Sequence, residues 1–254
     1  MKLITLGTGA GNPSMTRYNS SSYLETVNGG YLIDAGAPLA ASMVRKKIDF
    51  NSIRAVFLTH MHEDHFGGLT GFLKNRMTDV PCCVLLNKAW RGFWPEVWLP
   101  QEDAIEAFDR LMAVQFRGYR RSRIKYRLIH PGVFYDDSFL RVTAISNQHD
   151  FYRGESLPSY CFQIEAEGKK LVCTGDLRGS LVDFPFNAAE DADLLLCEFT
   201  HFDPMKQLEV FRKIHPRKLV FNHVATRNAQ IFPDFSRLFD YPMFLAEDGD
   251  EFGF

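Results

Sequence analysis

The chain has 254 residues, of which 46% are hydrophobic and 24% are charged, and its formal net charge is -2. This composition is ordinary for a globular protein with enough length for one large domain or two small ones. The charge gives no general attraction to nucleic acid or to anionic lipid, although a local basic patch could still bind either.

The apolar runs and the cysteines both indicate a soluble, cytoplasmic protein. No apolar run approaches the ~20 residues that span a bilayer, and glycines break the first run too soon for a signal peptide. The five cysteines have no CxxC spacing, so neither a disulfide framework nor a thiolate zinc site is indicated. We therefore expect buried thiols and no membrane partner.

Short apolar, β-branched or aromatic runs with turn residues between them predict a chain rich in strands. These strands are predicted at residues 2–7, 21–26, 29–36, 53–60, 82–87, 140–146, 159–168, 169–176, 193–198 and 218–223. Helices are predicted at Ala37–Lys47, after His65, at Glu102–Phe116 and at Met205–Ile214. Strands that form hairpins, with helices between them, predict an α/β (α+β) fold of two mixed sheets flanked by helices.

Residues 88–127 differ from the rest, because they combine three tryptophans, an amphipathic helix and the basic run RGYRRSRIKYR. We expect an inserted helical hairpin whose aromatic side chains pack on the body and whose arginines form a solvated face. The alternative is a lid or a dimer contact, in which Arg120 and Arg121 reach for a substrate phosphate.

The stretch THMHEDHFGG places three histidines and an aspartate directly after a predicted strand. His60 and His62 are two residues apart, so both rings can face one point, while Asp64 and His65 can face a second point nearby. Imidazole and carboxylate groups suit zinc and similar divalent metals. The stretch therefore predicts a site for two metal ions.

The spacing HxHxDH resembles the signature of the metallo-β-lactamase fold family. The other motifs of that family have matches in the same order: Asp34 in LIDAG, His149 in ISNQHD, Asp176 in VCTGD and His223 in LVFNHV. The resemblance covers nearly the whole chain except the insertion. It implies a single domain, residues 1–254, with the four-layer αββα sandwich of that family.

The resemblance also implies a division of the metal ligands. His60, His62 and His149 would hold one ion, Asp64, His65 and His223 would hold the other, and Asp176 would bridge the pair. Asp34 would orient a ligating histidine through its other ring nitrogen. For Asp34 and His149, a turn or capping role is the alternative. The cofactors expected are two divalent ions, Zn²⁺ first, with Mn²⁺ or Fe²⁺ as alternatives.

Two such ions, about 3.5 to 4 Å apart, lower the pKa of a bridging water, so that hydroxide is available near pH 7. This chemistry predicts a hydrolase, in which Asp64 orients the hydroxide or accepts its proton. Oxygen chemistry in the same fold usually replaces one histidine with an acidic residue, and HMHEDH retains all of them. Redox use is therefore disfavoured.

The opening LGTGAGNPSMTRYNSSSYLE is similar to the phosphodiesterase branch of the family, which includes tRNA 3′-processing nucleases and cyclic-nucleotide phosphodiesterases. The hydroxyls of Ser20, Ser21 and Ser22 could meet an anionic group, and a plain strand start is the alternative. The stretch DLLLCEFTHFD is similar to a segment of the tRNA nucleases, with matches at Glu198 and Thr200.

Three departures argue against a tRNA nuclease. Cys197 stands where those enzymes have a histidine, and both their His-Ser-Thr motif and their glycine-rich substrate arm are missing. His201 is the remaining nearby histidine that could protonate a leaving oxygen, and a surface or capping role is its alternative.

These observations predict a metal-dependent hydrolase of a small phosphodiester or cyclic phosphate, with a small anionic molecule as substrate. One alternative is a lactone, thioester or amide hydrolase that uses the same site. Another is an RNA-processing nuclease that binds nucleic acid through its basic run, which the three departures disfavour. A homodimer is an expectation from the resemblance alone.

Overall fold

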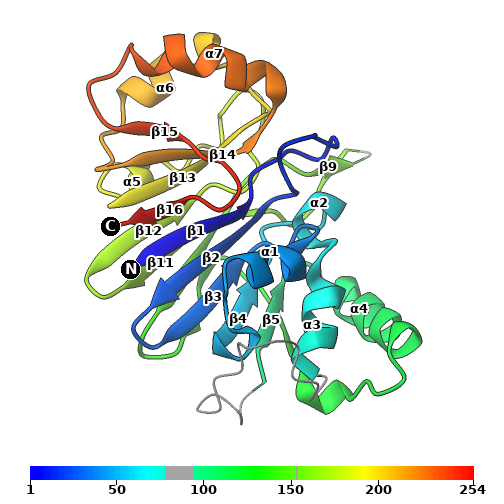
Figure 1. Ribbon diagram of the computed structural model, residues 1–254. Coiled ribbons are helices and arrows are strands. Elements are labelled where there is room, and N and C mark those ends of the chain that lie inside the picture. Colours follow the sequence, from blue (N-terminus) through cyan, green and yellow to red (C-terminus); the bar gives the residue numbers. More distant parts are fainter. Residues whose placement is uncertain (78–93, 153) are drawn as a thin grey trace.

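The computed structural model describes residues 1–77, 94–152 and 154–254 (Figure 1). Two mixed seven-stranded sheets lie face to face, and helices cover their outer faces. This arrangement confirms the predicted αββα sandwich. The strand predicted at residues 82–87 and the first two cysteines, Cys82 and Cys83, lie outside the described residues.

The first sheet has the strand order β16-β1-β2-β3-β4-β5-β6. Pairing is antiparallel from β16 to β3 and parallel from β3 to β6. The strands are β1 Lys2–Gly7, β2 Ser21–Thr26, β3 Gly29–Ile33, β4 Ile53–Phe57, β5 Glu96–Leu99, β6 Lys125–Leu128 and β16 Glu251–Gly253.

The second sheet has the order β15-β14-β13-β12-β11-β8-β7. Pairing is parallel from β15 to β12 and antiparallel from β12 to β7. The strands are β7 Gly132–Asp136, β8 Arg141–Ser146, β11 Tyr160–Ala166, β12 Lys169–Cys173, β13 Leu194–Phe199, β14 Leu219–Val224 and β15 Met243–Leu245. A separate pair is formed by β9 Phe151–Tyr152 and β10 Glu155–Ser156.

The helices divide between the two outer faces (Figure 1). On the first sheet lie α1 Leu39–Arg45, α2 Glu63–Phe66, α3 Leu69–Met77 and α4 Glu102–Gln115. On the second lie α5 Phe186–Ala189, α6 Leu208–Arg212 and α7 Thr226–Ser236. Short 3₁₀ turns occupy Phe50–Ser52, Arg121–Arg123 and Pro204–Lys206. Helices α1, α3 and α4 match predicted positions, whereas the helix predicted at 205–214 is a 3₁₀ turn followed by α6.

Alternate side chains of the central strands enter different apolar layers. In β4, Phe57 packs between the two sheets and Val56 packs under the helices of the first sheet. In β13, Leu196 packs between the sheets and Cys197 packs under the helices of the second. Because successive side chains of a strand point to opposite faces, a continuous apolar run gives a strand buried on both sides.

The described part of the predicted insertion, residues 94–127, belongs to the first sheet. Strand β5 pairs with β4, β6 pairs with β5, and α4 connects the two strands. The prediction of an inserted helical hairpin was therefore wrong for these residues. Both strands have four residues, and Pro95 and Pro100 flank β5, so the alternation was too short to recognise.

No helix of the described residues is long and apolar enough to span a membrane. The three cysteines in this part of the chain, Cys161, Cys173 and Cys197, are buried free thiols. Their burial raises the pKa of each thiol. They therefore serve as apolar core residues.

Asp137, which follows β7, joins the two sheets through contacts with side chains of β3, β4 and β7. Its Oδ2 accepts hydrogen bonds from the hydroxyls of Tyr31 (2.7 Å) and Tyr135 (2.9 Å) and from Nε of Arg54 (2.8 Å). Burial works to raise the pKa of Asp137, but the bonds from Tyr31 and Arg54 outweigh burial and hold that pKa below its ordinary value. The ionised carboxylate therefore stabilises the sandwich.

Asp137→Asn is expected to lower the free energy of unfolding by roughly 1 to 3 kcal/mol at pH 7, because charge-assisted hydrogen bonds are lost. Since the folded-state pKa is depressed, this contribution is present above the unfolded pKa of about 4 and is lost as the pH falls through the folded pKa. Urea unfolding from pH 7 to pH 3 should show the wild type converging on the variant. The neighbouring exposed Asp136→Asn is the control, and equal losses in both would contradict the role of Asp137.

Candidate metal centre

The residues predicted as metal ligands meet where strands of both sheets end. Strand β4 ends before His60, β8 before His149 and β12 before Asp176, while His223 lies near the end of β14 and Asp34 follows β3. Because the carboxyl ends of parallel strands meet at one edge of a sheet, the fold brings together residues that are far apart in the sequence.

One group of ligand atoms belongs to three histidines and an aspartate. His62 Nδ1 lies 3.0 Å from His60 Nε2 and 3.4 Å from His149 Nε2. Asp176 Oδ2 lies 3.7 Å from His60 Nε2 and 3.6 Å from His149 Nε2. Each of the four residues offers a ligand atom within 4.8 Å of the others. Three imidazoles and a carboxylate at this spacing suit one divalent ion.

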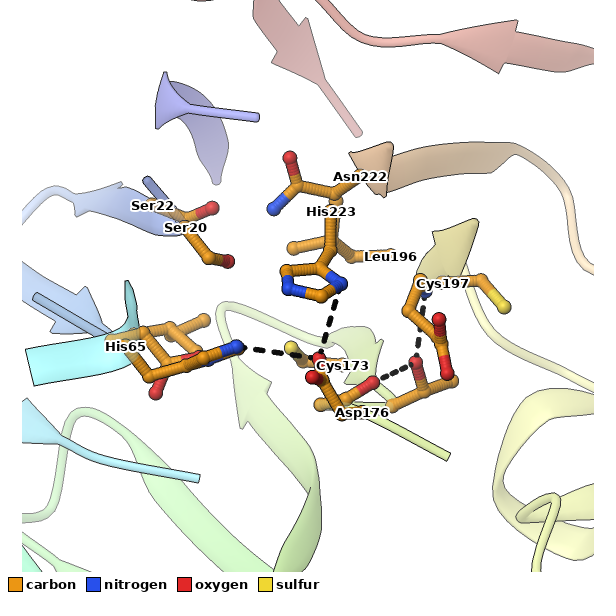
Figure 2. A pocket seen from close by; sticks show the side chains of 14 residues that line it. Ser20, Ser22, His65, Cys173, Asp176, Leu196, Cys197, Asn222 and His223 are labelled. Atoms are coloured by element: carbon orange, nitrogen blue, oxygen red, sulfur yellow. Dashed lines mark hydrogen bonds and ion pairs between the residues drawn. The ribbon is translucent and has the colours of Figure 1, made fainter. Parts of the chain in front are cut away.

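A second group lies on the other side of the same carboxylate. Asp64 Oδ2 is 3.0 Å from His223 Nε2 and 3.6 Å from His65 Nε2. Asp176 Oδ1 is 3.4 Å from both His65 Nε2 and His223 Nδ1, as the dashed lines in Figure 2 show. Asp176 therefore presents one oxygen to each group of ligands.

Buried polar atoms without a hydrogen-bond partner provide a test of whether metal ions fit here. Within the described part of the chain, these atoms include His65 Nε2, Asp176 Oδ1 and His223 Nδ1. A buried polar atom without a partner is costly, and three of them converge between the two sheets. Cations bound at this point would satisfy them. The donor set therefore fits a pair of divalent ions.

Asp34 contacts the ring of His65. Its carboxylate lies 2.8 Å from His65 Nδ1 and accepts hydrogen bonds from the backbone N–H (2.8 Å) and the hydroxyl (3.0 Å) of Thr59. The Thr59 hydroxyl also lies 3.1 Å from His60 Nδ1. The rings of His60 and His65 are thus held through Nδ1, which leaves their Nε2 atoms directed at the centre.

The centre concentrates opposite charges away from water. Burial disfavours the imidazolium form of His65, but the carboxylates of Asp176 and Asp34 outweigh it and hold the pKa of His65 well above its ordinary value. Burial likewise opposes the charge of Asp176, but His223 and His65 keep the pKa of Asp176 well below its ordinary value. Burial and then His65 lower the pKa of His60. Carboxylates that stabilise a positive charge on a neighbouring imidazole so strongly also favour a bound cation.

Asn147 is a buried residue of the centre that the sequence analysis missed. Its Nδ2 donates to the carbonyl oxygens of Asp176 (2.9 Å) and Thr174 (3.5 Å), and its Oδ1 accepts from the backbone N–H of His149 (3.3 Å). One amide therefore ties together the loops that carry two predicted ligands. The sequence feature that could have indicated its place at the centre is its position directly after a strand and two residues before His149.

Glu198 and His201 form a pair beside the centre. The two oxygens of the buried Glu198 lie 3.1 and 3.0 Å from His201 Nδ1, and one of them accepts from the backbone N–H of His201 (2.9 Å). Burial lowers the pKa of His201, but the hydrogen bond and charge of Glu198 outweigh it and raise that pKa. The rings of His201 and His149 are 4.5 Å apart. His201 also forms a third possible ligand group with Asp176 and His223.

The three serines predicted to meet a substrate are buried near the centre. Ser20 and Ser22 line a cavity of about 20 Å³ beside His65, Asp176 and His223 (Figure 2). That volume holds about one water molecule. Ser21 is 1% exposed and does not line the cavity. All three serines are buried, and their contact with an anionic substrate stays a prediction.

The structure does not bring Arg120 and Arg121 to the centre. They precede β6, which runs parallel to β4 through β5, whereas His60 follows β4. The arginines therefore lie at the opposite end of the sheet, where Arg121 pairs with Asp109 (3.2 Å) and lies over the ring of Tyr126. The prediction that they contact a substrate at the metal ligands was wrong, because the sequence did not show β5 and β6.

Comparison with known proteins agrees with this geometry. A protein-family model described as the metallo-beta-lactamase superfamily matches residues 15–217. The ribonuclease Z of Oceanobacillus iheyensis is 24% identical over 280 residues, which cover 89% of this chain and 90% of that protein. Other bacterial ribonucleases Z are 30% identical, but the chain spans only 46 to 47% of their length, which is about half.

Solved structures share the fold at low sequence identity. The metallo-beta-lactamase fold protein YhfI from Bacillus subtilis has a TM-score of 0.76 at 16% identity, with 99% of each chain covered. The short form of human tRNase Z has a TM-score of 0.74 at 22% identity, with 100% of this chain and 99% of that chain covered. These similarities extend over the whole sandwich.

Asp34→Asn is expected to lower the affinity for Zn²⁺ about 10- to 100-fold, the usual effect of losing the partner that orients a ligating histidine. Asparagine retains the size of the side chain and tolerates the positive φ of 58° at this position. Competition with a chromogenic chelator measures the affinity. The exposed Asp136→Asn is the control, and unchanged affinity in Asp34→Asn would show that His65 needs no such support.

Proposed function

The chain belongs to the metallo-beta-lactamase superfamily and is a metal-dependent hydrolase, and we propose that it cleaves a phosphodiester bond in a small anionic substrate. The observation that carries this proposal is the position of Asp176, whose two oxygens face two separate groups of imidazole and carboxylate ligands. Two divalent ions held by these groups, which we propose to be Zn²⁺, Mn²⁺ or Fe²⁺, would lower the pKa of water and stabilise negative charge on the attacked group.

We propose that Asp64 is the general base. Its Oδ2 already accepts from His223 (3.0 Å), which fixes the direction of the carboxylate. The hydrogen bond and charge of His223 outweigh burial and lower the pKa of Asp64, so that the carboxylate is ionised. Gly11 lies so close that a Cβ there would be 3.2 Å from Asp64 Oδ2. The loop between β1 and β2, which contains Gly11 and is called the first loop below, therefore limits the space for substrate at this carboxylate.

We propose that His201 protonates the leaving oxygen. Its Nδ1 is held by Glu198, so Nε2 remains to carry a proton toward substrate. The same contact argues against His201 as a metal ligand, because Nδ1 is the nitrogen that lies 3.8 Å from Asp176. The raised pKa of His201 favours the protonated form that a general acid requires.

Two arginines beside the centre support an anionic substrate. Arg178 follows Asp176 by two residues and donates to the side chain of Gln148 (3.2 Å). Arg227 is the second residue of α7 and donates to the carbonyl oxygen of Thr200 (3.0 Å). Both side chains are exposed, and neither forms an ion pair with a described residue. Guanidinium groups so placed suit a phosphate.

An RNA 3′-processing nuclease is the second candidate, because the curated relatives described above are ribonucleases Z. The pair Glu198 and His201 is compatible with either substrate. Against RNA stand the net charge of -2 and the placement of Arg120 and Arg121 away from the ligands. The two candidates differ in the length of the substrate rather than in the bond that is broken.

Protein loaded with Zn²⁺ or Mn²⁺ is expected to hydrolyse bis(p-nitrophenyl) phosphate, and Asp176→Ala should lose about 10³-fold or more of this activity, which corresponds to several kcal/mol of transition-state stabilisation. A lactone, a thioester and an RNA with a 3′ extension complete the assay. Preferred cleavage of the RNA would favour the nuclease, and turnover of a carbonyl substrate alone would overturn the phosphodiesterase proposal.

His201→Gln is expected to lose about 10²- to 10⁴-fold in kcat with uridine 2′,3′-cyclic phosphate, because the departing alkoxide needs a proton. With bis(p-nitrophenyl) phosphate the same variant should lose far less, since p-nitrophenolate leaves without one. The exposed His215→Gln is the matched control. Equal losses with both substrates would show that His201 acts through structure rather than as an acid.

A further inference from the structure

A cavity of about 90 Å³ lies behind the first loop, away from the metal ligands, and we propose that it binds a small oxyanion. It is lined by Leu6, Tyr18, Ser42, Arg45, Lys46, Asp248 and Gly249. These residues come from β1, from the end of the first loop, from the last turn of α1 and from the segment before β16. The proposal does not rest on the function proposed above.

Ser42 provides the first indication of a ligand. It lies in α1 and is 5% exposed, yet its hydroxyl forms no hydrogen bond with any described residue. Most buried hydroxyl groups in folded proteins have a partner, and the hydroxyl of a serine can donate one hydrogen bond. A ligand atom in the cavity that this residue lines would supply the missing acceptor.

Arg45 provides a second, independent indication. Its hydrogen bond is to the hydroxyl of Tyr18, and its guanidinium lies 5.4 Å from the centre of the same ring. Among the described residues, no carboxylate pairs with Arg45. The guanidinium therefore retains free donors beside the cavity, and the Tyr18 hydroxyl, which accepts from Arg45, still has its own proton to donate. Three donors thus lie on one cavity, which suits an oxyanion.

The other charged residues of the cavity are already satisfied. Lys46 pairs with Glu251 (2.6 Å) and donates to the carbonyl oxygen of Gly249 (2.9 Å). Asp248 accepts from the backbone N–H (2.8 Å) and the hydroxyl (2.7 Å) of Thr8 and from the backbone N–H of Tyr18 (2.6 Å). The carboxylate of Asp248 is thus bound by donors of the first loop and does not pair with Arg45. Arg45 can therefore bind the ligand.

The size of the cavity limits the ligand. A single water needs about 10 to 15 Å³ of such volume, so 90 Å³ admits a group of several atoms. A phosphate, a sulfate or a short carboxylate fits this description, and a nucleotide does not. The shared chemistry is that of a small oxyanion with acceptors directed at Arg45, Ser42 and Tyr18.

The cavity adjoins the loop that packs on the metal centre. The backbone N–H of Gly9 donates to the carbonyl oxygen of Tyr18 (2.7 Å), and Gly11 of the same loop lies against Asp64. An anion bound to the Tyr18 hydroxyl would therefore stabilise the loop that bounds the space beside Asp64.

Selenate is a suitable probe, because it is a small oxyanion whose selenium scatters anomalously. Crystals of the metal-loaded protein soaked in selenate are expected to show an anomalous peak in this cavity, and calorimetric titration should give saturable binding. Arg45→Gln should weaken that binding about tenfold or more, since a charge-assisted hydrogen bond is lost. Ser42→Ala and Tyr18→Phe should each weaken it by a smaller factor.

Two controls locate the bound ion. Asp176→Ala should retain the binding that Arg45→Gln loses, and Arg237→Gln, which changes an exposed arginine of a surface ion pair, should bind like the wild type. Binding lost in Asp176→Ala but kept in Arg45→Gln would place selenate at the metal centre and overturn the proposal. A crystal peak without binding in solution would mean an adventitious ion only, and would also overturn it. Because binding rather than turnover is measured, failure of the phosphodiesterase proposal would not affect the result.

Discussion

The site depends on one buried carboxylate. Asp176 is 2% exposed, and its two oxygens face different groups of histidines. One oxygen faces histidines from the loops that follow β4 and β8, and the other faces a group that includes His223 near the end of β14. A carboxylate at this depth remains charged only because the imidazoles around it offset the cost of burial. The two groups are therefore coupled through a single side chain, and a displacement of Asp176 would disturb both.

Rigid surroundings keep that carboxylate in place. Asn147 binds the backbone of Asp176, and the strands that lead to the centre are buried on both faces. Two glycines allow the close approach of the loops: a Cβ at Gly36 would lie 2.2 Å from the carbonyl oxygen of Asp64, and one at Gly175, where φ is +54°, would lie 2.8 Å from that of Tyr160. A larger side chain at either position would push the ligand loops apart.

The sequence predicted the part of the site whose residues are neighbours in the chain or stand at clear strand ends. The motif HMHEDH can be recognised without any other part of the sequence. Asp34, Asp176 and His223 each follow or end an apolar run. It failed where the evidence is tertiary. Strands β5 and β6 have only four residues each, and prolines flank β5, so neither strand was recognised. Pro233 inside α7 concealed that helix, and nothing local shows that Asn147 spans two loops. Composition suggests that arginines bind phosphate, but only the strand order tells which end of a sheet they occupy.

That strand order bears on the size of the substrate. Arg121 lies at the amino end of the parallel strands and His60 lies at their carboxyl end, with the five residues of β4 between these two ends. A strand of this length spans roughly 17 Å. A small phosphodiester held at the metal ligands cannot reach across that distance, whereas Arg178 and Arg227 lie beside the ligands themselves. The basic run around Arg121 can therefore contribute to binding only if the substrate is a long polyanion that follows the sheet. A dependence of turnover on these two sets of arginines would thus separate a small substrate from RNA by geometry, whichever bond is broken.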